Sequence, residues 1–429
     1  MYKTETLNNG VRLLRITDKS TKLIMIQINM RIGSDIENTT LLECCHLFEH
    51  LFAAYTSTKY PFSKQNTETL DFKSINNNAE VIEKEITFSL YFNKVNIEYV
   101  IDLLTNALID FKIDKTIFEQ EKNAVIEELN EIIKDSDYNF NTKINKILYK
   151  NHVRAYSEQM RLDNVKKITI KDMEKFFKKY ITAQNFIISI FGNVDTKHYN
   201  MLTKYMEKLK NNGKYIYKPY SLSLKEPIIF HKKDATISNL KLIFKTNYTK
   251  YNKEYYIIIA LTDILSGGLN SILMKKLRNE NGLVYYCNSY ISIDNINKEI
   301  SNISIETLCN TNNLLKVIKI IIDILNIIKN THIEDKYINA YKNNINLEKH
   351  KDTDFKSLDF LIDHYTHYYL WNKPIISPTK DYANSKNFTS KDLISMANKL
   401  FTQSNMVLCY DGSKQMNKDI QHIVAQIDL

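Results

Sequence analysis

Cysteine is scarce in this sequence of 429 residues, and glycine and proline are rarer than in most folded proteins, at 8 and 5 residues. The five cysteines are odd in number and form no C-x-x-C pair: Cys44, Cys45, Cys287, Cys309 and Cys409. A disulfide framework is therefore not expected, which indicates a reducing compartment. We interpret the adjacent Cys44 and Cys45 as small apolar packing residues, in preference to a redox or metal-binding pair.

Long apolar runs are also missing. No run reaches the length of about 20 residues that a membrane-spanning helix needs. The nearest candidate, Val317 to Ile328, contains Lys319, Asp323 and Asn326 and is interpreted as a core helix. Met1 to Arg15 lacks the apolar centre of a signal peptide and the Arg-rich and Ser-rich bias of a transit peptide. The sequence as written therefore predicts an intracellular, cytoplasmic protein with no membrane partner.

Charge excludes a further class of function. The formal net charge is +9, which is modest for this length, and the lysines are scattered and form no basic block. Nucleic acid is therefore not expected as a partner. An apolar content of 44% with 25% charged residues is ordinary for a folded protein, and the length suffices for two or three domains.

The stretch ECCHLFEHLF, from Glu43 to Phe52, carries the main chemical motif. His46, Glu49 and His50 form H-x-x-E-H, the inverted order of the commoner H-E-x-x-H zinc signature. On a helix, His46 and His50 would project from one face and could share one metal ion, while Glu49 would remain free to accept a proton. The alternative is a buried helix whose histidines form core hydrogen bonds. The motif alone does not decide between the two, and a third protein ligand is missing from it.

Periodicity and turn signals predict an α+β protein. In the first half we expect a hairpin within Thr4 to Ile16, strands at Leu23 to Ile32, Asn76 to Ile82, Ile86 to Phe92 and Phe186 to Phe191, and helices at Leu41 to Ala54, Ile97 to Phe111, Lys115 to Lys134, Ile144 to Leu148, Asp172 to Tyr180 and Tyr199 to Lys210. Thr39 and Thr40 are candidate N-cap residues for the motif helix. The segment after Pro61 reads as polar and irregular up to Asn76.

A similar order of elements restarts after a polar stretch. We expect strands near Ile228 and at Leu240 to Phe244, Val284 to Ile293, Ile300 to Thr307 and Met406 to Tyr410. We expect helices at Glu254 to Leu265, Leu314 to Ile328, Ile333 to Glu348, Leu358 to Leu370 and Lys391 to Leu400, and a further helix after Gly268 that continues through Leu277. The sequence therefore predicts two homologous α+β sandwich domains, residues 1–212 and 225–429, joined by a linker at 213–224. Each would contain a mostly antiparallel sheet covered by helices.

The helix expected at Lys115 to Lys134 is rich in carboxylates, and any of them could supply the missing ligand: Glu119, Glu121, Glu127, Glu128 and Glu131. The segment EKNAVIEE, together with H-x-x-E-H, resembles the pitrilysin and insulinase metallopeptidases, or inverzincins. The resemblance is to small two-domain members such as mitochondrial processing peptidase and bacterial homologues. Glu121 and Glu128 have the family's seven-residue spacing, and Glu128 follows His50 by 78 residues. The resemblance implies that His46, His50 and Glu128 bind one zinc ion per chain and that Glu121 supports the site. Glu127, the nearest competitor, lies on a different helix face.

A second block strengthens the resemblance. The segment from Ser266 to Tyr286 is similar to the stretch of the family's second domain in which an Arg and, seven residues later, a Tyr reach the substrate. Arg278 and Tyr285 have that spacing, and the resemblance implies that they bind substrate and assist catalysis. Without the surrounding match, a surface Arg and a packed Tyr would be the simpler interpretation.

A third resemblance concerns the substrate strand. Lys59-Tyr60-Pro61 and Asn78-Ala79 are similar to family segments, the second of which introduces an edge strand on which peptides pair as an added strand. Ser74 and Ile75 occupy the position of the family's glycine pair. The resemblance implies that Asn78 and Ala79 contact the substrate.

The function implied is that of a zinc metalloendopeptidase that cleaves extended peptides in a closed chamber, with Glu49 as general base. Because such a chamber contains four α+β units and this chain supplies two, the resemblance implies a homodimer. Two alternatives remain open: a non-catalytic structural member of the family, and the catalytic subunit of an obligate heterodimer with a related chain.

Overall fold

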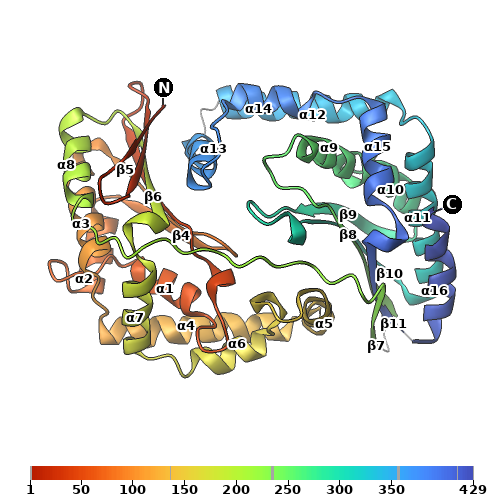
Figure 1. Ribbon diagram of the computed structural model, residues 1–429, viewed down its shortest axis with the longest axis horizontal. Coiled ribbons are helices and arrows are strands. Elements are labelled where there is room, and N and C mark those ends of the chain that lie inside the picture. The colour runs from red at the N-terminus through yellow and green to blue at the C-terminus, as the bar shows by residue number, and fades with distance from the viewer. Residues whose placement is uncertain (1, 136, 233–235, 355–357, 413, 429) are drawn as a thin grey trace. The chain divides into compact units, whose positions relative to one another are not determined.

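The computed structural model of the chain describes residues 2–135, 137–232, 236–354, 358–412 and 414–428 (Figure 1). Close contacts divide it into two compact units. Unit 1 contains residues 1–135, 152–218 and 357–375, and unit 2 contains residues 136–151, 219–356 and 376–429. This division crosses the chain at 218 and 219, within the expected linker. It differs from the contiguous domains 1–212 and 225–429, because two short segments each pack with the other half of the sequence.

Unit 1 is built on a six-stranded sheet with the strand order β1-β2-β6-β3-β5-β4. Its strands are β1 Tyr2–Thr6, β2 Arg12–Thr17, β3 Leu23–Met30, β4 Asn76–Val81, β5 Ile86–Asn93 and β6 Phe186–Gly192. Its helices are α1 Cys44–Phe52, α2 Ser63–Phe72, α3 Ile97–Asp110, α4 Lys115–Lys134, α6 Glu158–Val165, α7 Ile170–Tyr180, α8 Thr196–Met206 and α13 Leu358–Leu370. All strand pairs are antiparallel except β2 with β6.

The two faces of the unit 1 sheet carry different side chains because strand residues alternate between faces. On one face, Ile26 of β3 and Phe88 of β5 join Phe48 and Phe52 of α1 in a large apolar core. On the opposite face, α13 packs its buried Ile362 against a smaller apolar cluster that includes residues of β2, β3 and β6. Figure 1 shows the sheet between α3 and α8 on one side and α13 on the other.

Unit 2 repeats this architecture with the strand order β7-β11-β8-β10-β9. Its strands are β7 Ile228–Lys232, β8 Ile237–Lys245, β9 Val284–Ser292, β10 Asn302–Asn310 and β11 Met406–Gly412. Its helices are α5 Tyr138–Tyr149, α9 Glu254–Ser266, α10 Ile272–Met274, α11 Leu314–Asn330, α12 Asp335–Asp354, α14 Pro378–Ser385, α15 Ser390–Leu400 and α16 Asn417–Val424, and a π-helical turn, Lys275–Glu280, follows α10. The parallel pair β7 and β11 corresponds to β2 and β6 of unit 1.

The sheet of unit 2 is also covered on both faces. On one face, Leu240 and Leu242 of β8 pack against helices α9, α11, α15 and α16. On the other face, Ile243 of β8 packs against Ile144 and Leu148 of α5. Each sheet is therefore completed by one helix from the opposite half of the sequence: α13 in unit 1 and α5 in unit 2. The expected fold, two α+β units with mostly antiparallel sheets covered by helices, is confirmed.

Two local predictions next to the motif are wrong. The motif helix begins at Cys44, not at Leu41, and neither Thr39 nor Thr40 caps it. The segment after Pro61 contains α2, which has few buried residues and therefore no clear apolar period. Along the described part of the chain, no helix combines the length and apolar character needed to cross a membrane.

Candidate metal centre

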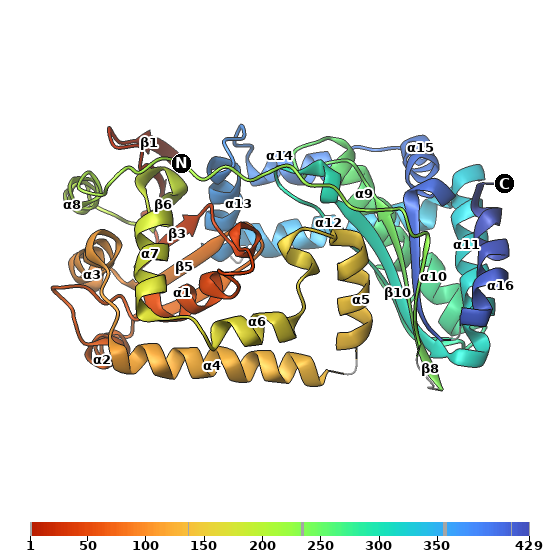
Figure 2. The same cartoon turned by 60° about the horizontal axis from the view of Figure 1, so that its bottom comes forward.

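Helix α1 places the motif on the side of unit 1 that faces α4 (Figure 2). Leu47, Phe48, Leu51 and Phe52 are buried in the core, so His46 and His50, one turn apart, emerge together on the side that faces α4. Figure 2 shows α4 running beside α1 and α6. The two imidazole rings meet edge to face with their centroids 4.9 Å apart.

Each imidazole is held at its Nδ1 by a carboxylate. His46 Nδ1 lies 3.0 Å from Glu43 Oε2, and His50 Nδ1 lies 2.9 Å from Glu121 Oε2 of α4. Because a carboxylate can only accept, Nδ1 of each ring carries the proton, and the neutral ring keeps its lone pair on Nε2. Paired carboxylates of this kind fix the orientation of metal-binding histidines.

The two Nε2 atoms converge on Glu128 of α4. Glu128 Oε2 lies 3.1 Å from His46 Nε2, and Glu128 Oε1 lies 3.8 Å from His50 Nε2. An imidazole lone pair and a carboxylate oxygen at such distances repel each other unless a proton or a metal cation lies between them. Ligand atoms on a tetrahedral zinc ion are about 3.3 Å apart, given Zn–N distances of about 2.0–2.1 Å. The distances of 3.1 and 3.8 Å lie on either side of this value, so the two imidazoles and the Glu128 carboxylate are compatible with the ligands of a zinc ion.

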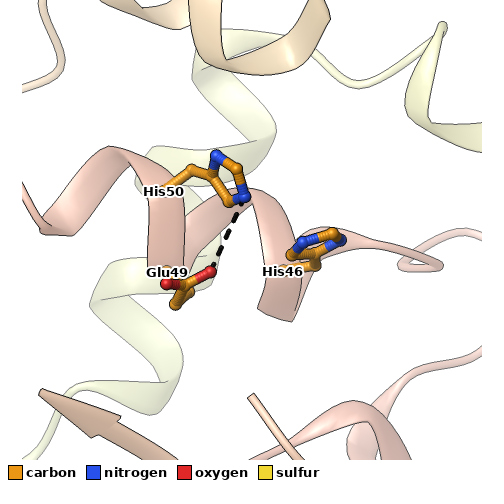
Figure 3. A group of neighbouring side chains, drawn as sticks. All are labelled: His46, Glu49 and His50. Carbon is orange, nitrogen blue, oxygen red and sulfur yellow. Dashed lines mark ion pairs between the residues drawn. The ribbon is translucent and has the colours of Figure 1, made fainter. Parts of the chain in front are cut away.

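Glu49 lies beside these donors (Figure 3). Its Oε2 is 3.8 Å from His50 Nε2, and its ligand atom lies within 4.8 Å of those of His46 and His50. Burial raises the pKa of Glu49, and the nearby His50 and His46 lower it by less, so the net shift is upward. A carboxylate with a raised pKa is a better proton acceptor near neutral pH.

A buried ion network anchors the beginning of α1. Glu37 Oε1 accepts from the backbone N–H of Cys45 at 2.9 Å, and Glu37 Oε2 accepts from that of Glu43 at 3.2 Å. Arg161 of α6 donates to Glu37 Oε2 at 3.1 Å and to Glu43 Oε1 at 2.8 Å. Glu37 thus satisfies N–H groups that Thr39 and Thr40 were expected to cap.

The same network shifts the pKa values of Glu43, Glu37 and His46. Burial opposes ionisation of Glu43, but hydrogen bonds from His46 and Arg161 outweigh it and hold the pKa of Glu43 below its ordinary value. Burial raises the pKa of Glu37 to about 7 despite the charge of Arg161. Burial lowers the pKa of His46, but the hydrogen bond to Glu43 more than compensates, so the net shift is upward.

Glu43, Glu37 and Arg161 were not predicted as functional residues. For Glu43 a signal existed, because it precedes His46 by three residues. Glu37 and Arg161 lie on separate elements and meet only in the folded chain. Their contacts have no local sequence pattern.

Cys44 and Cys45 are fully buried in the core of unit 1. Burial raises the pKa of both thiols, and the nearby Glu37 adds to the shift. A protonated thiol is neither a strong nucleophile nor a good zinc ligand. This environment favours the packing role over a redox or metal-binding role.

Arg278 and Tyr285 lie in unit 2 and contact each other. The guanidinium carbon of Arg278, on the π-helical turn, lies 4.8 Å from the ring centroid of Tyr285 on β9. Tyr285 is 78% exposed, so it is not the packed Tyr of the simpler interpretation.

Asn78 and Ala79 lie on β4, which is an edge strand of the unit 1 sheet. Asn78 pairs with Ser89 and is exposed, whereas Ala79 pairs with Phe88 and faces the core shared with α1. The side chain of Asn77 donates to the backbone carbonyl of Ala53 at 3.2 Å, which fixes this strand beside the end of α1. The outer backbone edge of β4 therefore lies close to the metal centre.

Comparisons with known proteins give a consistent picture. Residues 12–160 match the family described as Insulinase (Peptidase family M16), and residues 167–345 match the Peptidase M16 inactive domain. His46, Glu49, His50, Glu121 and Glu128 all lie in the first match, and Arg278 and Tyr285 lie in the second.

Individual relatives are distant. The uncharacterized zinc protease YmxG of Bacillus subtilis is 26% identical over 301 residues, which cover 68% of this chain and 70% of that protein. The zinc protease PqqE of Helicobacter pylori is 25% identical over 298 residues, which cover 64% of this chain and 63% of that protein. A crystal structure of a protease from Helicobacter pylori has the same fold, with a TM-score of 0.81 and 18% identity over 96% of this chain and 100% of that one.

Proposed function

Because the chain belongs to the insulinase family, peptidase family M16, we propose that it is a zinc endopeptidase that cleaves extended peptides. His46, His50 and Glu128 would hold one zinc ion, and Glu49 would act as general base. The observation that carries the proposal is the position of Glu128, whose two oxygens face the Nε2 atoms of both histidines. Glu43 and Glu121 would hold the two rings in the orientation that binding requires.

When bound, the zinc ion would lower the pKa of a coordinated water to about 7 and polarise the substrate carbonyl. Glu49, whose Oε2 lies 3.8 Å from His50 Nε2, would accept the proton of the attacking water and pass it to the leaving amine. The two histidines would hold their positions throughout, because each ring is anchored at Nδ1.

The substrate would bind in extended form. The outer edge of β4, which pairs with no other strand in the described part of the chain, can pair with a peptide as an added strand, with Asn78 and Ala79 among the contacts. The hydrogen bond from Asn77 to Ala53 holds this edge beside α1, and a bound peptide backbone would thus pass close to Glu49. Pairing through the backbone would select unstructured peptides more than particular sequences.

We further propose that two copies of the chain assemble into a homodimer that encloses the substrate. Arg278 and Tyr285 of one chain would then serve the metal centre of the other. The Arg278 guanidinium can bind substrate oxygens, and the exposed Tyr285 hydroxyl can donate to the carbonyl oxygen as it gains negative charge. Their mutual contact would hold both side chains in place. An intracellular, cytoplasmic location remains a prediction.

Mixed dimers test this assembly. A Glu128→Gln chain and an Arg278→Ala chain, each inactive alone, should regain part of the activity when mixed, because one of the two sites in a mixed dimer is intact. Confirmed mixing without recovery would contradict the exchange of residues. Activity only in the presence of a different, related chain would favour the heterodimer alternative.

Cleavage of unstructured peptides by the purified, zinc-loaded chain tests the proposal as a whole. The wild type should cleave, and Glu49→Gln should bind zinc normally but cleave at least about 100-fold more slowly, the lower range for a general base. Cleavage by Glu49→Gln at the wild-type rate would refute the mechanism. A wild type that binds zinc but cleaves no peptide would favour the non-catalytic alternative.

A further inference from the structure

A cavity of about 370 Å³ lies on the α13 side of the unit 1 sheet. Its lining includes Gln27 of β3, Ser89 of β5, and Asn78 and Glu80 of β4. These residues are in register across the three strands, on the face opposite to Phe88 and Ala79, which pack toward α1. The cavity and the metal centre are therefore on opposite faces of the same edge strand.

The lining of the cavity is acidic. Among the described residues that line it are three carboxylates, from Glu80, Glu85 and Asp363, and one imidazole, from His367, but no Lys or Arg. Glu80 and Asp363 are exposed, and Glu85 is buried. The carboxylates of the lining are hydrogen-bond acceptors, and a cluster of acceptors of negative charge favours a cationic ligand.

Two buried amides point to the same kind of ligand. Gln27 and Asn29 are each only 3% exposed and line the cavity, and their side-chain oxygens have no hydrogen-bond partner among the described residues. Their nitrogens donate to carboxylates at 2.7 Å: Gln27 to Asp363 and Asn29 to Glu85. Since a carboxylate cannot donate, neither amide can be turned around. The lining therefore offers acceptors that lack a donor, an unfavourable state that a donor-bearing ligand would relieve.

The geometry of β4 indicates how such a ligand would arrive. In a peptide paired with β4, alternate side chains point to opposite faces of the sheet. One set would lie on the face of Ala79, toward α1, and the other on the face of Asn78 and Glu80, over the cavity. The volume is near the lower end of the roughly 300–1,000 Å³ of small-molecule sites, which suits one long side chain with some water.

We infer that this cavity is a specificity pocket for a basic side chain, Arg or Lys, of the peptide that binds along β4. The inference rests on the proposed function, because it requires a peptide on that edge. The cationic group enters between Glu80 and Asp363 and donates to the acceptors of the lining. The residues next to it in the peptide face α1 and the metal centre.

Binding to the full-length Glu49→Gln chain tests the pocket without requiring cleavage. Fluorescence anisotropy would compare labelled peptides that differ at one position, Arg against citrulline, which has nearly the same shape but no charge. Scanning that position along the peptide should reveal sites at which Arg binds about tenfold or more tightly, the range expected for a hydrogen-bonded charge. Peptides with Lys should bind more tightly than peptides with norleucine, its uncharged counterpart, at the same positions.

Substitutions in the Glu49→Gln background assign the preference to the cavity. Glu80→Gln and Asp363→Asn should each bring the ratio of Arg to citrulline affinity toward one, and Glu80→Lys should favour Glu over Gln at the same positions. Glu174→Gln, which removes an exposed carboxylate on α7 outside the lining, should keep the original ratio.

Each other outcome overturns the inference. One such outcome is equal affinity for the Arg and citrulline peptides at every position. A second is a preference for Arg that Glu80→Gln and Asp363→Asn leave unchanged, and a third is that no peptide binds. Calorimetry that detects Ca²⁺ in this cavity, lost in Glu80→Gln, with no preference for Arg would identify a metal site instead. An Arg preference in a chain whose wild type cleaves nothing would contradict the proposed function alone, and cleavage without the preference would contradict the pocket alone.

Discussion

The side chain of Glu43 accepts a hydrogen bond from Nδ1 of His46 at 3.0 Å. Glu43 is the residue just before α1 and has a left-handed backbone conformation, with φ of 68°. It is held by Arg161, which also bonds Glu37, and Glu37 in turn bonds the first N–H groups of the helix. The orientation of one candidate metal ligand is therefore tied to the beginning of its own helix.

Glu43→Ala should weaken zinc binding by about 10–100-fold, the usual effect of losing the outer partner of a ligating histidine. Glu43→Gln keeps an acceptor oxygen for His46 and should lose less. Zinc affinity would be measured by competition with a chromophoric chelator, and circular dichroism of the metal-free chains would show whether the fold is retained. Unchanged affinity in a folded Glu43→Ala chain would contradict the positioning role.

Glu128 and Glu127 form a matched pair for testing the third ligand. They are neighbours on α4, but Glu128 is the one that contacts both imidazoles. Glu128→Gln should reduce zinc affinity by more than the 10–100-fold expected for an outer partner, because it removes an anionic ligand. Glu127→Gln should bind zinc like the wild type. Equal losses in both variants would mean that α4 contributes through its overall charge.

Asp35 should control the acid stability of the region before α1. Its carboxylate accepts from Arg154 twice at 2.8 Å and from Lys84 at 2.9 Å. Burial raises the pKa of Asp35, but these bonds outweigh it and hold the pKa below the ordinary 3.8. The stabilisation is complete above pH 3.8 and is lost as pH falls through the folded-state pKa.

Asp35→Asn should therefore lower the free energy of unfolding at pH 7, by up to about 3–5 kcal/mol, because it removes the buried carboxylate that Arg154 and Lys84 share. The difference from the wild type should shrink below pH 3.8. Urea unfolding at pH 7 and at pH 3.5 measures both effects, and Asp71→Asn, an exposed Asp on α2, is the control. A difference that is constant with pH would exclude Asp35 as the titrating group.

Helix α13 should stabilise unit 1 although it lies far along the sequence. Ile362 is fully buried against residues that include Leu14, Met25 and Phe191. Ile362→Ala should cost about 2–5 kcal/mol and should increase hydrogen exchange in β2, β3 and β6. Faster exchange confined to the strands of unit 2 would show that the helix belongs there.

Elements whose signals are local could be predicted from the sequence. Helix α4 runs from Lys115 to Lys134, as predicted, and Asp114 caps it through the N–H groups of Thr116 and Ile117. The hairpin of β1 and β2 has its turn at Asn9 and Gly10, where Gly10 adopts the positive φ that such turns require. Both features depend on residues within a few positions of each other.

Features that depend on distant contacts could not be predicted. The beginning of α1 was misplaced because Glu37, six residues before Glu43, takes the role expected of Thr39 or Thr40. An amphipathic pattern shows that α5 and α13 are helices but does not identify the sheet that each one covers. For the same reason the motif indicated His46, Glu49 and His50 and the family resemblance indicated Glu128, whereas Arg161 had no pattern that would connect it to them.

X-ray absorption at the zinc edge, on the full chain loaded with one equivalent of zinc, tests the central claim most directly. The account predicts two imidazole nitrogens at about 2.0–2.1 Å and carboxylate or water oxygens, without sulfur. In Glu128→Gln, the imidazole scattering should persist while the oxygen contribution changes. A sulfur ligand at about 2.3 Å, or a spectrum with fewer than two imidazoles, would contradict the assignment of His46, His50 and Glu128 as the metal centre.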